Sequence, residues 1–225
     1  MNAVNVFIGY DPRQPVAFHT LAHSIWSKAS VPVSITRLQL SQLPLTRTGL
    51  TEFTYSRFLV PYISNYEGTS IFVDSDFVCR EDIAELLVYP IAFPEHAVFV
   101  SKNKLAFEWA SLMVFNNAQC RILTPEFVED PSNSCFDFTW ASSVGDLPQT
   151  WNHLVGYDEP NPDAKMVHYT QGVPCWPETK DCEHADTWMG VAKNVMRTVS
   201  FKELMGRSVH AKRVYARLQK QQTTV

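Results

Sequence analysis

Short apolar runs rich in β-branched residues alternate along the chain with stretches of helical spacing. Five such runs predict buried strands: Val4–Gly9, Val33–Leu38, Ser70–Val73, Val98–Ser101 and Ser111–Phe115. A helix is expected after the first strand, with Pro15 in its first turn, and a short one over Asp82–Val88. Thr54–Tyr66 also has helical spacing, which Pro61 kinks or divides. This alternation predicts an α/β fold in which helices flank a mixed, mainly parallel sheet.

The segment Pro125–Asp163 breaks the pattern. It is rich in Pro, Asn, Asp, Ser and Trp and has little periodicity. Structureless connections of that length are uncommon inside compact domains, and the aromatic residues argue against disorder. We therefore expect this segment to form a functional lid or an acceptor surface.

Composition narrows the class of protein. The 225 residues are 45% hydrophobic and 19% charged, with a formal net charge of −4. These values exclude intrinsic disorder, and the mild acidity argues against a nucleic-acid binder. Neither a membrane-spanning run of about 20 apolar residues nor a secretory signal is visible. The five cysteines are odd in number and form no Cys-x-x-Cys pair, which favours a reducing, cytoplasmic location.

Charge is distributed unevenly. Residues 198–225 carry six basic side chains and one acidic one, so the other residues hold the acidic excess. We divide the chain into a main domain, residues 1–197, and a basic C-terminal helix or tail, residues 198–225. A solvated helix face is the first interpretation of the tail, and weak contact with an anionic membrane surface is the alternative.

The strongest chemical signal is Asp74-Ser75-Asp76, which directly follows the predicted strand Ser70–Val73. Ligands of open α/β sheets gather at the carboxyl ends of strands. Two carboxylates there offer hard oxygen ligands for Mg²⁺ or Mn²⁺, which in turn bridge the oxygens of a diphosphate. An Asp-x-Asp tripeptide also occurs by chance in many loops, so the strand before it carries most of the argument.

His168 is the second signal. It ends an apolar segment, and Gly172 follows in a turn that suits close approach of the backbone to a phosphate. A lone histidine at a strand end is usually structural. A neutral imidazole arriving late in the chain would also complete a mixed Asp/Asp/His metal site.

The order of these motifs resembles that of the GT-A glycosyltransferases, most closely the family-8, glycogenin-like group and its bacterial relatives. The resemblance extends from the first strand to about Trp188, and the segments that carry it are Val6–Asp11, Phe53–Phe58, Asp74–Asp76, Ser111–Asn116, Leu147–Asn152 and His168–Trp176. It implies a single GT-A domain, a divalent cation held by Asp74, Asp76 and His168, and transfer of a sugar with retention of configuration. The residues that it places at the nucleotide-sugar donor are Gly9, Tyr10, Asp11, Arg57, Asp74, Ser75, Asn152 and Gly172.

The chain departs from the family pattern in two places. Gly172 stands four residues after His168 instead of three, and Pro174-Cys175-Trp176 replaces the family's Lys-Pro-Trp, so the phosphate-binding lysine is missing. Lys180 or Arg57 is a possible substitute. The family's acidic segment before Leu147 is not intact either, which leaves Asp137 as the candidate for the sugar-facing catalytic residue.

Several of these residues have a plain structural alternative. Tyr10 either stacks on a base or covers the sheet edge, and Asp11 either bonds to the nucleoside or caps the first helix. Arg57 either neutralises phosphate charge or forms a surface ion pair.

Two further histidine groups are candidate metal sites. His19 and His23 stand four residues apart on the first helix, but without the glutamate of a metalloprotease motif we expect them to pack against neighbouring helices. Cys175, Cys182 and His184 fit no standard zinc spacing, so we expect the two cysteines to be buried or simply exposed.

We therefore predict a metal-dependent hexosyltransferase that takes its sugar from a nucleotide-sugar donor, a UDP-sugar first, and passes it to a carbohydrate or glycoconjugate acceptor. The missing lysine motivates an alternative, a nucleotide-sugar-binding protein of the same fold without turnover. A nucleotidyltransferase shares the sheet and the metal, but Gly9–Arg13 is not the Gly-rich, basic loop that such an enzyme carries near its first strand.

Overall fold

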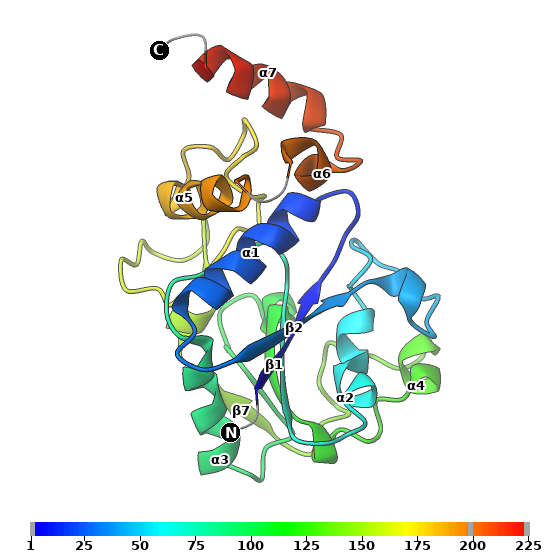
Figure 1. Ribbon diagram of the computed structural model, residues 1–225. Helices are drawn as coiled ribbons and strands as arrows, with labels where there is room; N and C mark the ends of the chain where they lie inside the picture. Colours follow the sequence, from blue (N-terminus) through cyan, green and yellow to red (C-terminus); the bar gives the residue numbers. More distant parts are fainter. Residues whose placement is uncertain (1–2, 198–199, 223–225) are drawn as a thin grey trace.

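A mixed six-stranded sheet forms the centre of the protein in a computed structural model that describes residues 3–197 and 200–222 (Figure 1). Its strand order is β2-β1-β3-β6-β5-β7. The pairs β1–β2, β1–β3 and β5–β7 are parallel, whereas β6 runs antiparallel to β3 and β5. The strands span Val4–Gly9 (β1), Val33–Leu38 (β2), Thr69–Val73 (β3), Val98–Val100 (β5), Leu112–Asn116 (β6) and Val144–Asp146 (β7). The mixed, mainly parallel sheet expected from the sequence is confirmed.

A second, three-stranded sheet continues from the end of β3. It contains β4 (Phe77–Cys79), β8 (His153–Leu154) and β9 (Met166–His168), with β9 in the middle. β9 pairs antiparallel with β4 so that Phe77 lies opposite His168, and it pairs parallel with β8. This small sheet therefore places a residue from late in the chain beside the turn that follows β3.

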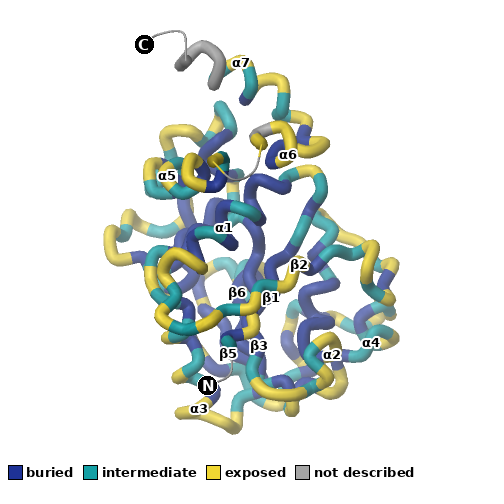
Figure 2. The backbone as a smooth tube through the Cα atoms, in the orientation of Figure 1, coloured by how far each residue is buried: buried dark blue, intermediate teal, exposed yellow. Residues whose placement is uncertain are grey.

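Helices cover both faces of the central sheet (Figure 1). On one face, Leu21 and Ile25 of α1 pack against the inward side chains of β1 and β3, and Figure 2 shows α1 as largely buried. On the other face, Phe58 and Trp140 pack against Phe72 of β3 and the strands beside it. The α-helices are α1 (Pro15–Lys28), α2 (Val60–Ile63), α3 (Val88–Ala92), α4 (Pro125–Glu129), α5 (Ala185–Val195), α6 (Phe201–Met205) and α7 (Ala211–Gln222).

Two expected helices are shorter or of a different kind than the sequence spacing suggested. Thr54–Tyr66 forms a 3-10 turn followed by the single turn of α2, and Pro61 lies in the first turn of α2, where its missing N–H costs no hydrogen bond. Asp82 caps a 3-10 turn that leads into α3, since its carboxylate accepts a hydrogen bond from the backbone N–H of Ala84 at 3.0 Å. The 3-10 turns are η1 (Leu40–Gln42), η2 (Ser56–Leu59), η3 (Ile83–Leu87), η4 (Ala106–Ser111), η5 (Asn117–Gln119) and η6 (Gln149–Trp151).

The segment Pro125–Asp163 is more regular than its composition suggested. It contains α4, contributes β7 to the central sheet and β8 to the small sheet, and buries the side chains of Trp140 and Trp151. Short strands of two or three residues leave too little alternation for a sequence pattern to reveal. A role for the rest of this segment as a lid or acceptor surface stays a prediction.

The C-terminal segment packs onto the main body. Leu204, Met205 and Val214 are buried in a cluster with Val16 of α1 and Trp188 of α5. Figure 1 shows α5, α6 and α7 gathered at one end of the molecule, beyond the N-terminal end of α1. The basic tail expected over residues 198–225 therefore shares part of the core, while residues 198–199 and 223–225 lie outside the described residues. Among the helices described, none is long and apolar enough to cross a membrane.

Candidate metal and donor site

Asp74, Asp76 and His168 come together where the two sheets meet. Asp74 follows β3, Asp76 precedes β4, and His168 ends β9. The Nε2 atom of His168 lies 3.3 Å from Oδ1 of Asp76, and one ligand atom of each of the three residues lies within 4.8 Å of the others. The β4–β9 register produces this arrangement, because it stacks the His168 ring on Phe77 with the ring centroids 4.1 Å apart.

The donor atoms of this cluster fit a divalent cation. Oδ1 of Asp74 and Oδ1 of Asp76 are both buried; the first lies 3.0 Å from Nη2 of Arg57 and the second 3.3 Å from Nε2 of His168. One arginine and one imidazole thus face two buried carboxylates, and a cation bound between the carboxylates would balance the charge that the arginine leaves. Two carboxylates and one imidazole form a ligand set that suits Mn²⁺ or Mg²⁺.

Proton binding at the cluster is strengthened in the folded protein. Burial raises the pKa of Asp74, Arg57 opposes this effect, and the neighbouring carboxylate of Asp76 adds to it. Burial lowers the pKa of His168, but the carboxylates of Asp76, Glu108 and Asp74 outweigh burial and the pKa is raised. Both shifts mean that protons compete with a cation for this cluster.

Asn152 fixes the protonation and direction of the His168 ring. Its Oδ1 lies 3.0 Å from Nδ1 of His168, and its Nδ2 donates to the carbonyl of Glu108 at 2.9 Å. An amide oxygen only accepts, so Nδ1 of His168 carries a proton, and in the neutral ring Nε2 is the nitrogen left to bind a cation. Asn152 is fully buried and both polar atoms of its side chain contact protein. Its contact with the donor stays a prediction.

Glu108 is a site residue that the motifs did not reveal. It lies in η4, where its Oε2 accepts a hydrogen bond from the Ser111 hydroxyl at 2.8 Å and lies 4.0 Å from Nδ1 of His168. No spacing in the sequence distinguishes this glutamate from the others. The only available signal was its position just before the strand Leu112–Asn116.

Arg57 pairs with Asp74 instead of facing an open site. Its Nη1 donates to Oδ2 of Asp74 at 3.1 Å and to the carbonyl of Ala110 at 2.9 Å, and Nη2 lies 3.0 Å from Oδ1 of Asp74. The Arg57 side chain is only 5% exposed. The ion pair is buried and its partner is a site carboxylate, so it is not the surface ion pair considered from the sequence; a role of Arg57 at the donor phosphates stays a prediction.

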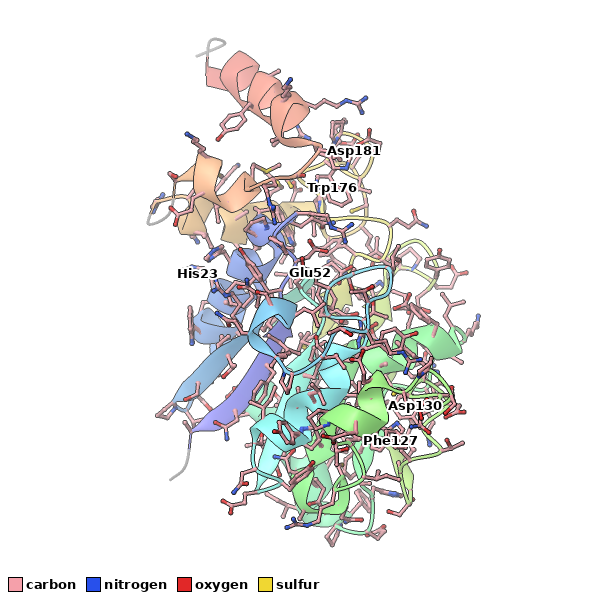
Figure 3. The ribbon with its side chains drawn as sticks, turned by 90° about the vertical axis from the view of Figure 1, so that its right-hand side faces the viewer. His23, Glu52, Phe127, Asp130, Trp176 and Asp181 are labelled. Atoms are coloured by element: carbon pink, nitrogen blue, oxygen red, sulfur yellow. The ribbon has the colours of Figure 1, made fainter. Side chains whose placement is uncertain are left out.

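A cavity of about 380 Å³ opens beside Asp76. Gly172 lies on its wall with a φ of +117°, and a Cβ at that position would come within 2.4 Å of the Trp176 ring. The indole of Trp176 stacks on His210, so the C-terminal segment also lines the cavity. Figure 3 places Trp176 and Glu52 in the upper half of the molecule, away from Phe127 and Asp130 near α4. The lining residues are Arg13, Gln14, Leu50, Thr51, Asp76, Thr170, Gln171, Gly172, Trp176, Ser208, Val209 and His210.

The loop after β1 approaches the same region. Asp11 is buried and accepts hydrogen bonds from the backbone N–H of Arg13 at 2.8 Å and from its guanidinium. Burial alone would raise the pKa of Asp11, but the hydrogen bonds from Arg13 outweigh burial, and the pKa is lowered from its ordinary value. The Arg37 guanidinium lies 4.7 Å from the centre of the Tyr10 ring. Gly9 leaves room for the Phe53 ring, which a Cβ would meet at 2.4 Å.

The remaining candidate residues lie in different settings. Ser75 is buried between the two aspartates. Asp137 is exposed, and its carboxylate bonds to the backbone and hydroxyl of Thr139 within its own turn. Its role in sugar recognition stays a prediction. Lys180 pairs with the neighbouring Asp181 and is exposed, an arrangement that does not direct it to the cavity.

Comparisons with known proteins place the chain among glycosyltransferase-like folds. No protein-family model matches it. It is 34% identical over 224 residues to Protein CDI of Arabidopsis thaliana, an alignment that covers 82% of this chain and 84% of that protein.

Solved structures with a similar fold include three glycosyltransferases. The apo structure of the bifunctional glycosyltransferase WbbM matches with a TM-score of 0.65 and 18% identity over 96% of this chain and 51% of WbbM. GlyE of Streptococcus pneumoniae matches with a TM-score of 0.65 and 15% identity over 90% of this chain and 64% of GlyE. The galactosyltransferase LgtC, in complex with donor and acceptor sugar analogues, matches with a TM-score of 0.59 and 11% identity over 91% of this chain and 100% of LgtC. The chain thus spans about half the length of WbbM and under two thirds of GlyE, and the GT-A-type fold expected from the sequence is confirmed.

Proposed function

Because the chain belongs to the family of the Arabidopsis thaliana Protein CDI and has a glycosyltransferase fold, we propose that it transfers a sugar from a nucleotide-sugar donor to a carbohydrate or glycoconjugate acceptor. One observation carries the proposal. Asp74, Asp76 and His168 converge at the carboxyl end of β3 with their ligand atoms within 4.8 Å of one another, and a cavity opens beside Asp76.

These three residues are the ligands that would hold Mn²⁺ or Mg²⁺. A cation there supplies a positive charge that stabilises a departing nucleoside diphosphate. Asn152 holds the proton of the neutral His168 ring on Nδ1, which leaves Nε2 to bind a cation, and Arg57 balances the charge of Asp74. The Gly172 turn lines the cavity beside Asp76, and its backbone is the proposed contact to phosphate oxygens.

Donor recognition is assigned to the cavity and the loop after β1. Gly9, Tyr10, Asp11 and Ser75 are the proposed contacts to the nucleoside. The ring of Tyr10 provides the stacking surface. A UDP-sugar is the first donor to test, since the family-8 resemblance of the motifs favours it.

Retention of anomeric configuration is the proposed stereochemistry. It rests on the resemblance to family-8 enzymes, which stays a proposal for this chain. The acceptor hydroxyl would attack from the face on which the diphosphate leaves, because we identify no carboxylate placed to act as a covalent nucleophile.

Substitution of the ligands tests the function. Asp74→Asn and His168→Ala should each abolish Mn²⁺-dependent release of nucleoside diphosphate from the donor, because each removes one ligand. A panel of nucleotide sugars with Mn²⁺, screened by thermal shift, identifies the donor for this assay. Full activity of either variant in the presence of a chelator contradicts the proposal.

A nucleotide-sugar-binding protein without turnover is the second candidate, and the cavity favours it in one respect. The described lining residues include one arginine, Arg13, which is paired with Asp11, and no lysine. Calorimetric titration of the donor with and without Mn²⁺, followed by an assay for released nucleoside diphosphate, separates the two functions. Binding without release identifies the non-enzyme.

A reducing compartment, the cytoplasm first, is the proposed location. All five cysteines are free thiols, and four of them are buried. Burial raises the pKa of Cys79, Cys120 and Cys175 to about 12, which keeps these thiols protonated and unreactive. Weak contact of the basic C-terminal helix with a membrane surface stays a prediction.

A further inference from the structure

A second group of metal-binding side chains lies on the other side of the small sheet. His153 is the first residue of β8, and Glu183 and His184 directly precede α5. Nε2 of His153 lies 2.9 Å from Oε2 of Glu183, and Nε2 of His184 lies 3.1 Å from Oε1 of the same carboxylate. We propose that His153, Glu183 and His184 form a structural zinc site, distinct from the Asp74 cluster and independent of the proposed transferase function.

The surroundings of His153 point to a cation. Its side chain is 3% exposed and lies between two carboxylates, with Nε2 facing Glu183 and Nδ1 lying 3.8 Å from Oδ2 of Asp158. A neutral imidazole has one N–H, so when Nε2–H donates to Glu183 the lone pair of Nδ1 faces the Asp158 carboxylate 3.8 Å away. Either a second ring proton or a cation bound to Nε2 removes this mismatch, and the cation places Nδ1–H toward Asp158 in the carboxylate–histidine–metal arrangement common at metal sites.

His184 shows the same crowding of acceptors. Its Nε2 lies 2.9 Å from the carbonyl oxygen of Asn161 in addition to the 3.1 Å contact with Glu183, so two acceptors compete for one nitrogen. The residue has a φ of +56°, a backbone conformation uncommon outside glycine that persists where the surrounding contacts hold it. These contacts direct the imidazole at the same carboxylate that His153 faces.

The ligand chemistry favours zinc over manganese. Two imidazole nitrogens and one carboxylate form a set common in zinc sites, and the carbonyl oxygen of Asn161, 2.9 Å from Nε2 of His184, is the candidate for a fourth ligand. The Asp74 cluster has one imidazole and two carboxylates, a set with more oxygen ligands, which suits hard cations such as Mn²⁺ and Mg²⁺ better. The two clusters therefore differ in the metal that they prefer.

A cation at this position would cross-link three parts of the chain. It would join β8 to the start of α5 and to the loop that contains Asn161. β8 pairs with β9 so that Leu154 lies opposite His168. Asn152 and His153 are neighbours, and one contacts His168 while the other contacts Glu183. The zinc site would therefore hold in place the strand that orients the ligand of the first cluster.

The sequence named Cys175, Cys182 and His184 as a loose cluster and favoured burial or simple exposure of the two cysteines over a metal site. Cys175 is buried in the core around Trp188, and Cys182 is half-buried. Among the described residues, the candidate metal group that includes His184 contains no cysteine. Figure 3 shows Asp181, on the loop that leads to Glu183, close to Trp176 and far from α4. His153 is separated from this loop by β9, which is why spacing could not identify it.

Zinc titration of the full chain tests the proposal. The background variant Asp76→Asn/His168→Gln removes two ligands of the first cluster, so that Zn²⁺ binding reports on the second. After treatment with chelator and dialysis, this variant should bind one Zn²⁺ per chain and show a higher Tm with Zn²⁺. In the same background, Glu183→Gln and His184→Asn should weaken Zn²⁺ binding at least 100-fold. Asparagine is chosen at position 184 because it tolerates a positive φ.

Matched controls separate this site from surface binding. His23→Gln, which removes one histidine of the pair His19 and His23 on α1, should leave the zinc affinity unchanged. Asp158→Asn should weaken it about 10-fold, since it removes the charge beside Nδ1 while keeping an oxygen that can accept the hydrogen bond from the backbone N–H of Leu154. The proposal is overturned if Glu183→Gln binds Zn²⁺ like its parent, or if His23→Gln is the variant that loses it.

X-ray absorption spectroscopy of the unsubstituted protein with one equivalent of Zn²⁺ gives an answer that does not depend on the folding of any variant. Two imidazole ligands with oxygen and no sulfur support the site. One imidazole identifies binding at the Asp74 cluster instead, and sulfur identifies a cysteine site. Either of these results overturns the proposal.

Discussion

Removal of the Arg57 side-chain charge should destabilise the protein, because Asp74 would then be a buried carboxylate without a counter-ion. In Arg57→Met, the apolar stem is kept and the guanidinium is lost. The ion pair at 3.0 Å and the hydrogen bonds to Asp74, Ala110 and Phe53 disappear together. Arg57 and Asp74 are 4% and 7% exposed, so water cannot replace the lost partner.

The magnitude follows from the cost of leaving a buried charge unpaired. Breaking a buried pair by removing one partner costs about 3–5 kcal/mol of the free energy of unfolding. The carboxyl can instead take up a proton, and because the pKa of Asp74 is already raised to about 7, parent and variant both hold that proton at pH 5. Arg57 lowers this pKa, so its removal raises the pKa of Asp74 further and the loss of stability relative to the parent grows as the pH rises. We expect about 3–5 kcal/mol at pH 8 and about 2 kcal/mol or less at pH 5.

Urea unfolding of metal-free protein at the two pH values measures these quantities. Arg57→Lys is a control that keeps the charge but not the two-pronged geometry, and it should lose less than Arg57→Met. The double variant Arg57→Met/Asp74→Asn should recover much of the loss at pH 8, since no charge is left unpaired. A loss below about 1 kcal/mol in Arg57→Met at pH 8, or a loss that does not depend on pH, refutes the reasoning.

Three further predictions concern the metal and donor site. The affinity for Mn²⁺ should rise between pH 6 and pH 8, by up to about tenfold per pH unit for each proton displaced, because the raised pKa values of Asp74 and His168 let protons compete at low pH. Titration with a metal indicator measures this affinity, and a flat pH profile contradicts the prediction. Asn152→Leu should weaken Mn²⁺ binding about 10- to 100-fold, whereas Asn152→Asp should weaken it less because it keeps an acceptor for Nδ1 of His168. Equal Mn²⁺ affinities of the two variants in the same titration argue against an orienting role of Asn152. Gly172→Ala should lower the free energy of unfolding by about 1–3 kcal/mol and reduce donor binding, because residue 172 has a φ of +117° and its Cβ would collide with the Trp176 ring. Thermal unfolding and calorimetry test this, and unchanged stability and unchanged donor affinity mean that the turn adapts.

The parts of the fold that the sequence could predict are those in which local pattern and burial agree. The strands β1, β2 and β3 are runs of five or six residues rich in β-branched side chains, and their positions follow from the local sequence pattern alone. The Asp74 and Asp76 pair was predictable because it follows one of these runs. β7 and β8 could not be predicted, since strands of three and two residues depend on partners from distant parts of the chain.

Interactions at the site depended even more on distant contacts. Arg57 was expected at the phosphates, and only the packing of η2 against β3 reveals that Asp74 is its partner. Glu108 and Asn152 reach His168 from η4 and from the residue before β8. These contacts join residues that lie 16 or more positions apart in the sequence, so no local pattern encodes them.

Asn152 and His153 are neighbours in the sequence, but Asn152 contacts His168 and His153 contacts Glu183. This arrangement restricts where members of this family can gain or lose residues. Successive residues of a strand point to opposite faces, so insertion or deletion of one residue between Asn152 and Leu154, where β8 begins, would exchange the side chains presented to His168 and to Glu183. Functional relatives should therefore vary in length in exposed loops such as the one around Asp130, and keep a constant number of residues from Asn152 to Leu154.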